Sequence, residues 1–207
     1  MENKGKYKCS LAYDHLQRWC SYWYQINEVM QFSPETVLEV GIGMKVVAQY
    51  LFNHGIKLTT LDVDGGFRPD IVASVLRMPL DDNSFDVVLA AETLEHLPWS
   101  DFLPALREIH RVSKKYVVIS LPHWGRTISF SIKIPLLPRI KFALKLPVLK
   151  ENHFDPIGPV PGHYWEIGKK GYSVGKIRDV IKSAGFHIKK DFLPVENPYH
   201  HFFVLEK

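Results

Sequence analysis

The sequence has little of what secreted, membrane-spanning and nucleic-acid-binding proteins need. Its two cysteines, Cys9 and Cys20, are too few for a disulfide scaffold, so a reduced, cytoplasmic setting is expected. No apolar run reaches the roughly 18 residues of a membrane-spanning helix, and residues 1–10 contain no apolar core of a secretory signal. The net charge of +4 is too small to indicate a nucleic-acid partner.

Glycine is missing at one informative position. Residues 36–40 form a short apolar strand pattern that runs into Gly41 and Gly43, and glycines there let the backbone approach a ligand closely. A dinucleotide-binding turn needs another glycine three residues after the second, where this chain has Val46. The sequence therefore favours a ligand without phosphates over NAD, and a plain strand-turn-helix bend is the alternative.

A single acid strengthens the ligand-binding interpretation. Asp62 ends the next predicted strand, where a carboxylate can accept hydrogen bonds from both hydroxyls of a ribose. Alone it is equally typical of an aspartate that caps a strand end. Together, the glycine turn and Asp62 are more specific than either feature and predict a nucleoside site.

Alternating strand and helix patterns run along most of the chain. They predict an α/β fold with three layers: a Rossmann-like, seven-stranded, mostly parallel sheet that ends in an antiparallel hairpin and is preceded by an amphipathic helix. The expected strands are residues 36–40, 56–63, 70–73, 85–90, 116–121, 186–192 and 201–205, and the expected helices are residues 10–30, 44–53, 102–112 and 173–184.

Residues 124–162 interrupt this alternation within a single domain that spans residues 1–207. The segment is rich in proline, and six basic residues precede its first acid, Glu151. We interpret it as an inserted lid or cap over an apolar or anionic acceptor. Contact with a membrane or a lipid-like substrate through residues 126–150 is a second interpretation, and a cap with solvated lysines is a third.

Three segments carry a resemblance to a known family. Residues 39–43 (EVGIG) resemble motif I of the class I S-adenosylmethionine-dependent methyltransferases, and residues 78–98 (MPLDDNSFDVVLAAETLEHLP) closely resemble the next stretch of their type 11 members. Residues 162–166 and 184–186 resemble the family's C-terminal part. The resemblance implies S-adenosylmethionine as cofactor and methyl transfer to a small or medium-sized acceptor.

The resemblance also implies roles for individual residues. Glu39 would orient the glycine loop and approach the methionine end of the cofactor, Asp62 would hold the ribose, and Val63 would pack on the adenine. Ser74 and Val75 would face the adenine edge. The full set of implied cofactor-binding residues is Glu39, Gly41, Gly43, Asp62, Val63, Ser74, Val75, Ala91 and Glu92.

Two positions depart from the family pattern. Lys45 stands where the family has a third glycine, and a cation near a sulfonium is unfavourable unless the side chain turns away or pairs with Glu39. Ser74 stands where the family often has aspartate. These departures support an alternative function, a catalytically silent protein that binds cofactor or acts as an interaction module.

The acceptor side offers two candidate general bases, His96 and His123, each following a predicted strand; a surface or capping histidine is the alternative for both. Glu92, Glu95 and His96 also resemble the metal-binding E-x-x-E-H of small-RNA 2′-O-methyltransferases, with His163 as a further ligand. Because many small-molecule methyltransferases share this short motif, we assign no metal ligand from the sequence and keep a metal-assisted RNA methyltransferase as an alternative. Oligomeric state is not indicated.

Overall fold

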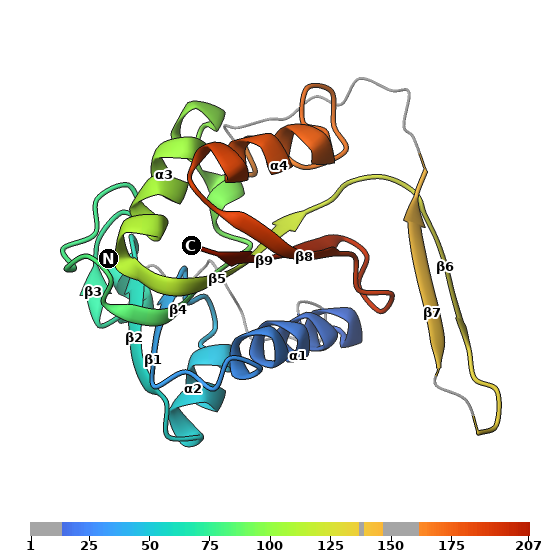
Figure 1. Ribbon diagram of the computed structural model, residues 1–207, viewed down its shortest axis with the longest axis horizontal. Helices are drawn as coiled ribbons and strands as arrows, with labels where there is room; N and C mark the ends of the chain where they lie inside the picture. The colour runs from blue at the N-terminus through green and yellow to red at the C-terminus, as the bar shows by residue number, and fades with distance from the viewer. Residues whose placement is uncertain (1–13, 137–138, 147–161) are drawn as a thin grey trace.

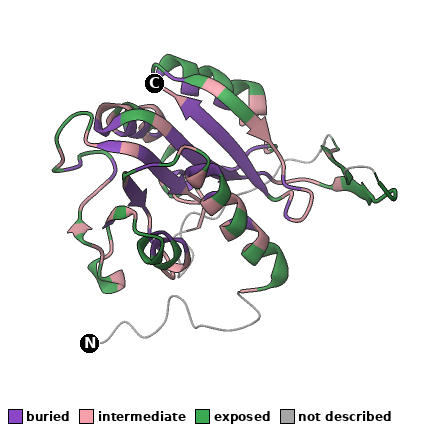
Figure 2. Ribbon diagram, turned by 60° about the horizontal axis from the view of Figure 1, so that its bottom comes forward, coloured by how far each residue is buried: buried purple, intermediate pink, exposed green. Residues whose placement is uncertain are grey.

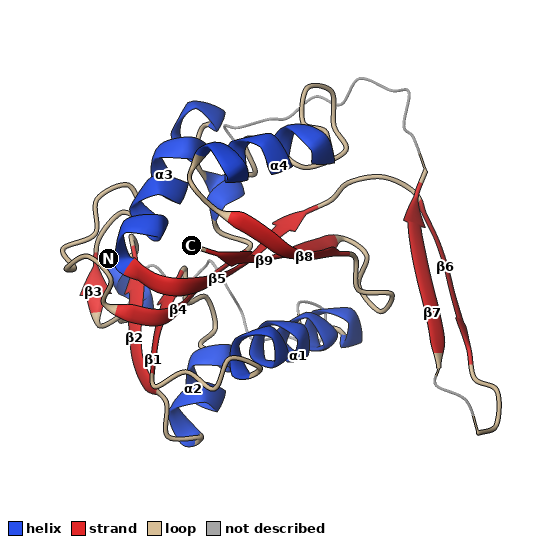
Figure 3. Cartoon of the chain, in the orientation of Figure 1, coloured by secondary structure: helices blue, strands red, loops and turns tan. Residues whose placement is uncertain are grey.

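The computed structural model describes residues 14–136, 139–146 and 162–207, and its centre is a seven-stranded sheet with the order β3-β2-β1-β4-β5-β9-β8 (Figures 1 and 3). The strands of this sheet are β1 (Thr36–Val40), β2 (Lys57–Asp62), β3 (Ile71–Val72), β4 (Phe85–Ala91), β5 (Ser113–Pro122), β8 (His187–Phe192) and β9 (His200–Glu206). The α-helices are α1 (Leu16–Met30), α2 (Val46–Asn53), α3 (Trp99–Val112) and α4 (Val174–Ser183), and the short 3-10 helices are η1 (Gly65–Phe67) and η2 (Leu94–His96).

Strand direction follows the prediction. The strands from β3 to β5 pair in parallel, while β9 runs antiparallel to both β5 and β8. The seven-stranded, mostly parallel sheet with an antiparallel C-terminal hairpin is therefore confirmed. The chain crosses from one side of β1 to the other between β3 and β4, so the carboxyl ends of β1 and β4 lie at the switch point where open α/β sheets bind ligands.

Two apolar layers hold the helices against the sheet. Successive residues of a strand point to opposite faces, so Leu38 packs under α3 and α4 whereas Val37 packs over α1 and α2. Figure 1 shows this division, with α3 and α4 on one side of the sheet and α1 and α2 on the other. Because both faces are covered, the central strands are buried along most of their length, as Figure 2 shows by colour, and they are apolar at nearly every position.

Helix α1 is present, but several of its large apolar side chains face away from the core. Leu16, Trp19 and Trp23 recur at three- to four-residue steps and are exposed by 75%, 52% and 58%, while the buried positions include Gln25 and Val29. Helix α1 begins at Leu16, and residues 10–13 of the predicted helix lie outside the described residues. Within the described chain no helix combines the length and apolarity needed to cross a membrane.

The described part of the predicted lid contains a second, two-stranded sheet. Strands β6 (Thr127–Ile132) and β7 (Ile140–Lys145) pair antiparallel and stand away from the main sheet in Figure 1. Residues 137–138 and 147–161 of the predicted lid, with Glu151 among them, lie outside the described residues. We did not predict these strands, although both alternate apolar with small or charged residues, because the prolines of the surrounding segment favoured an irregular lid.

Asp86 ties the beginning of β1 to β4 and β5. Its carboxylate accepts hydrogen bonds from the backbone N–H and the hydroxyl of Thr36, each at 2.8 Å, and pairs with Lys114 at 2.8 Å. Burial alone would raise the pKa of Asp86, but these contacts outweigh it and hold the pKa at about 2. A carboxyl whose pKa is lower in the folded state stabilises the fold above its unfolded pKa, and this contribution is lost as the pH falls towards 2.

We expect Asp86→Ala to lower the free energy of unfolding by about 1–2 kcal/mol at pH 7, because charge-assisted hydrogen bonds are lost. The difference from the wild type should shrink as the pH falls from 4 to 2. Urea denaturation at several pH values measures both effects, and Asp179→Ala, at an exposed position of α4, is the control. An unchanged difference at low pH would contradict this account.

Candidate functional site

The glycine turn is built for close approach. Gly41 follows β1 with a φ of +79°, and a Cβ at this position would lie 2.2 Å from the hydroxyl oxygen of Thr93, so only glycine fits. Gly43, at a φ of +44°, is different, because a Cβ there would meet no atom within 4 Å. The turn is thus packed on the β4 side and open on the other, where a ligand can lie against the backbone.

Asp62 fixes the position of this turn. One carboxylate oxygen accepts a hydrogen bond from the N–H of Ile42 at 3.1 Å, and the other accepts from the N–H of Asp64 at 2.9 Å. Each carboxylate oxygen has a second lone pair, so Asp62 can still accept hydrogen bonds from a ligand. The predicted pair of glycine turn and acid is therefore in direct contact.

Lys45 adopts a left-handed backbone conformation, which glycine adopts more readily than other residues do. Its φ is +61° and it caps the N-terminus of α2. Its amine donates a hydrogen bond to the carbonyl oxygen of Arg68 at 2.8 Å. The cation is thus bound to the loop that follows η1 instead of pairing with Glu39.

The expected adenine side follows β2 and β3. Val63 is 75% exposed next to Asp62, so its apolar surface is free to pack on a flat ring. The Ser74 hydroxyl accepts a hydrogen bond from the N–H of Leu76 at 3.2 Å, which orders the turn after β3, and Val75 is buried beneath it. These residues follow neighbouring strands, as predicted.

Glu39 is a buried carboxyl below the glycine turn. Its side chain lies at the end of β1, and one oxygen has no hydrogen-bond partner among the described residues. Burial raises the pKa of Glu39 to about 8. A buried, unpaired carboxyl of this kind is suited to a cationic group that arrives with a ligand.

Glu92 turns away from β4 at a φ of +50° and is held from two sides. The Ser120 hydroxyl donates to one of its oxygens at 2.8 Å, and the His200 ring lies 3.5 Å from the other. Burial raises the pKa of Glu92. Ala91 precedes it and pairs in register with Ser120 of β5, so both predicted residues lie at the carboxyl edge beside the glycine turn.

The two predicted bases differ strongly in environment. His96 is exposed at the end of η2. His123 is 6% exposed, its Nδ1 lies 2.9 Å from Nδ1 of His201, and burial lowers its pKa to about 3. A group with so low a pKa is a weak base at neutral pH.

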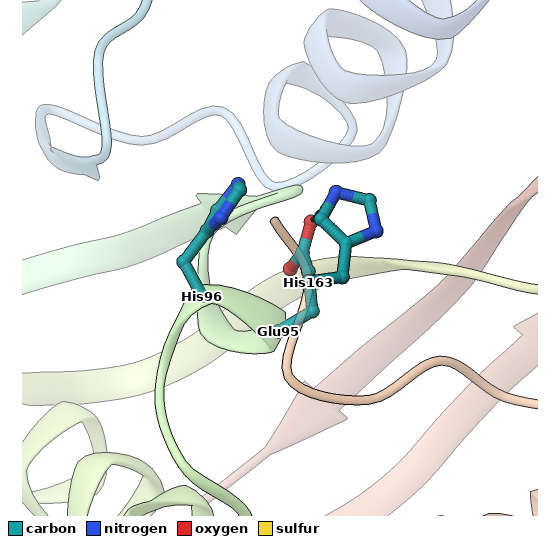
Figure 4. Close-up of side chains that lie close together, drawn as sticks. All are labelled: Glu95, His96 and His163. Atoms are coloured by element: carbon teal, nitrogen blue, oxygen red, sulfur yellow. Dashed lines mark ion pairs between the residues drawn. The ribbon is translucent and has the colours of Figure 1, made fainter. Parts of the chain in front are cut away.

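A polar cluster that the sequence only partly indicated lies behind η2. His163 contacts Glu166, with Nδ1 and Oε1 2.9 Å apart, and the Tyr199 hydroxyl donates to the same oxygen at 2.9 Å. Figure 4 shows Glu95, His96 and His163 side by side, with the Glu95 carboxylate between the two rings in that view. Glu166 and Tyr199 were missed as site residues, although residues 162–166 formed part of the resemblance.

An aromatic groove adjoins the glycine turn. It has a volume of about 730 Å³ and lies between α1 and α2. Its wall is formed by Trp19, Tyr22, Trp23, Ile26, Met44, Lys45, Val46, Gln49, Tyr50 and Asn53. The exposed rings of Trp19 and Trp23 on α1 therefore line a groove beside the site instead of contributing to the core.

The comparisons with known proteins agree with this geometry. Residues 38–120 match the sequence profile of the methyltransferase domain family, a match that begins in β1 and ends within β5. This part of the chain is a methyltransferase domain. The family, fold and enzyme class predicted from the sequence are thereby confirmed, and S-adenosylmethionine is the cofactor of this class of domain. None of the curated proteins matches the sequence.

Solved structures of methyltransferases share the whole architecture. The 1,6-didemethyltoxoflavin-N1-methyltransferase of Burkholderia thailandensis is 14% identical, with a TM-score of 0.62 over 95% of this chain and 84% of its own. A S-adenosylmethionine-dependent methyltransferase from Mesorhizobium loti is 16% identical, with a TM-score of 0.62 over 94% and 99%. Magnesium protoporphyrin IX methyltransferase from Synechocystis is 10% identical, with a TM-score of 0.65 over 98% and 90%. At such low identity these likenesses show the fold.

The residues of this methyltransferase fit S-adenosylmethionine. The space beside Gly43 admits a ligand against the backbone, and Asp62 retains free lone pairs. The unpaired oxygen of Glu39 lies where a cationic amino-acid group can approach. The turned-away amine of Lys45 removes the objection that a fixed cation would face a sulfonium.

We expect Lys45→Gly to change the dissociation constant for S-adenosylhomocysteine by less than about threefold, because the amine points to Arg68 and glycine adopts a positive φ without strain. Lys45→Met, which keeps the length of the side chain but removes its charge, is the matched control. Calorimetry gives the affinities. A tenfold change in either variant would mean that the Lys45 charge acts on the bound cofactor.

Proposed function

We propose that the chain transfers a methyl group from S-adenosylmethionine to a small or medium-sized acceptor that is apolar or anionic. The observation that supports this proposal most is the contact between Asp62 and the N–H of Ile42, because it joins the acid that we assign to the ribose to the open glycine turn. The cofactor supplies the activated methyl group. The chain supplies binding, alignment and exclusion of water.

Cofactor binding is divided among the carboxyl ends of four strands. Asp62 accepts hydrogen bonds from the ribose hydroxyls, and Val63 packs on the adenine. Ser74 and Val75 border the adenine from the loop after β3, whereas Glu39, Ala91 and Glu92 face the methionine end. The support for these roles is that the residues lie at or just after the carboxyl ends of β1, β2, β3 and β4, which are neighbours in the sheet.

The acceptor is expected beside α1 and the β6–β7 hairpin. The groove between α1 and α2 adjoins Met44 of the glycine turn and is lined by indole and phenol rings, which favour an apolar or aromatic molecule. The Burkholderia thailandensis neighbour is itself named for a small-molecule acceptor, 1,6-didemethyltoxoflavin.

The β6–β7 hairpin has one apolar face, which supports its role as a lid. Six side chains lie on this face in cross-strand pairs, and each is 43–53% exposed: Ile128, Phe130, Ile132, Ile140, Phe142 and Leu144. Lys141 and Lys145 alternate with them and belong to the other face. Such a ribbon suits an apolar acceptor or the surface of a membrane that contains one.

Proton removal, where the acceptor requires it, is assigned to His96. This histidine is exposed at the carboxyl edge, whereas His123 is buried with a strongly lowered pKa. We also propose a cytoplasmic location, because two cysteines offer no disulfide scaffold and Cys20 is free. A catalytically silent protein is the less favoured function, since its main argument was the charge of Lys45, which is bound elsewhere.

We expect Asp62→Ala to weaken S-adenosylhomocysteine binding at least tenfold, because two hydrogen bonds to a charged acceptor are lost. Asp179→Ala should bind as the wild type does. Isothermal titration calorimetry measures both, and circular dichroism verifies that the variants are folded. Failure of the wild type to bind S-adenosylhomocysteine would overturn the proposed function, and an unchanged affinity of Asp62→Ala would mean that the ribose lies elsewhere.

The affinity for S-adenosylhomocysteine should rise with pH between 6 and 7.5. Glu39 has a pKa of about 8 in the free protein, so it is mostly protonated at neutral pH. A bound ammonium group favours the ionised carboxylate, so binding releases a proton and the affinity increases by up to about tenfold per pH unit. Glu39→Gln cannot release this proton, and its calorimetric affinity should be flat across this range. A parallel slope in both proteins would contradict the role of Glu39.

A further inference from the structure

Three side chains with metal-binding atoms meet behind the carboxyl edge. Glu95, His96 and His163 each present one ligand atom, and these atoms lie within 4.8 Å of one another (Figure 4). Glu95 and His96 are neighbours on η2, whereas His163 comes from a segment more than sixty residues later in the chain. The fold thus assembles the group from two separate parts of the sequence.

Glu95 is the strongest indication of a ligand. Its side chain is completely buried, and neither of its carboxylate oxygens accepts a hydrogen bond from any described residue. Burying a carboxylate without a counter-charge or donor is costly, so such groups are paired or coordinate metal ions. Nε2 of His163 lies 3.8 Å from Oε1 of Glu95.

His163 is oriented as a metal ligand would be. Its Nδ1 lies 2.9 Å from Oε1 of Glu166, and that carboxylate also accepts from Tyr199 and pairs with Lys169 at 3.5 Å. As an anion, Glu166 accepts a hydrogen bond from the Nδ1–H of His163. The lone pair of Nε2 is then directed towards Glu95. A carboxylate behind an imidazole is the usual outer support of a metal-binding histidine.

The distances suit a four-coordinate ion. Two ligands of zinc at about 2.1 Å in a tetrahedral arrangement are about 3.4 Å apart. The separation of 3.8 Å between His163 and Glu95 is slightly longer, and it exceeds the length of a direct hydrogen bond. A small shift of either side chain would bring both within reach of one ion.

We propose that Glu95, His96 and His163 bind one zinc-type divalent ion, and that Glu166 supports the site from behind His163. Two imidazoles and one carboxylate favour zinc over magnesium or calcium, which prefer oxygen ligands. Glu92 is not a ligand, because its oxygens face Ser120 and His200. The site therefore differs from the sequence expectation, which assigned no metal ligand.

The ion would retain an open coordination position, since the chain supplies three ligands. Glu95 lies three residues after Glu92 at the carboxyl edge. The open coordination position would therefore accept an oxygen of the methyl acceptor, and the ion would increase the acidity of that group. This role, unlike the binding of the ion, rests on the proposed function. With the ion bound, His96 would be a ligand and would not act as a base.

The experiment measures zinc directly. Tag-free protein is stripped with EDTA, incubated with zinc, passed through a desalting column and analysed by mass spectrometry for metal content. The same stripped protein is titrated with cobalt while its visible absorption reports nitrogen and oxygen ligation. The variants are Glu95→Gln, His163→Ala and Glu166→Gln, and the control is His187→Ala, at an exposed position of β8.

We expect about one zinc per wild-type chain and the same for His187→Ala. Glu95→Gln and His163→Ala should lose the ion, and Glu166→Gln should bind it at least about tenfold more weakly. Retention of no zinc by the wild type would overturn the proposal. Equal zinc content in the wild type and His163→Ala would overturn it as well, as would a loss in His187→Ala.

Folding and cofactor binding are followed separately. Circular dichroism of each variant shows that it is folded, and Glu95→Gln, which keeps the shape of the side chain, covers the case in which His163→Ala is unstable. Binding of S-adenosylhomocysteine by the stripped protein tests the proposed function independently. If the protein binds zinc but not S-adenosylhomocysteine, the metal site stands and the proposed methyl-transfer function fails. If it binds S-adenosylhomocysteine but not zinc, only the metal site fails.

Discussion

The hydrogen bonds that Asp62 accepts from Ile42 and Asp64 organise the ligand-binding edge. They join the loop after β1 to the end of β2, and they fix both before any ligand is present. Gly41 lets the turn pack closely against Thr93 after β4, because a side chain at position 41 would overlap Thr93. The ends of three neighbouring strands thus lie together because of the Asp62 hydrogen bonds and the absence of a side chain at Gly41.

This edge was predictable from the sequence because its parts are local. Three features locate it along the chain: a strand followed by Gly41 and Gly43, a second strand that ends in Asp62, and a family-like segment that contains Glu92. In a parallel sheet those positions meet once the strands are paired. The strands themselves were predictable because their cores are apolar at nearly every position. The sequence also showed that Lys45 replaces the family's third glycine. It did not show where the Lys45 side chain points, since its partner is the backbone carbonyl oxygen of Arg68.

Other features depend on contacts that periodicity does not contain. The stripe of Trp19 and Trp23 predicts a helix correctly, but α1 packs with Gln25 and Val29 towards the sheet and leaves the aromatic rings to a groove. His123 follows a strand much as His96 does, yet one is buried against His201 and the other is exposed. The proximity of His163 to Glu95 arises from the path of the chain after the lid, and no spacing rule encodes it.

The position of β9 between β5 and β8 has a consequence for how the site assembles during folding. Strand β9 follows all the others along the chain, and it pairs with β5 along seven residues. Tyr199 and His200, which contact Glu166 and Glu92, arrive with it. The half of the sheet that holds the nucleoside edge is local and can form early, whereas the polar cluster needs this late, long-range closure. The acceptor side is therefore expected to assemble only after the last strand has paired with β5.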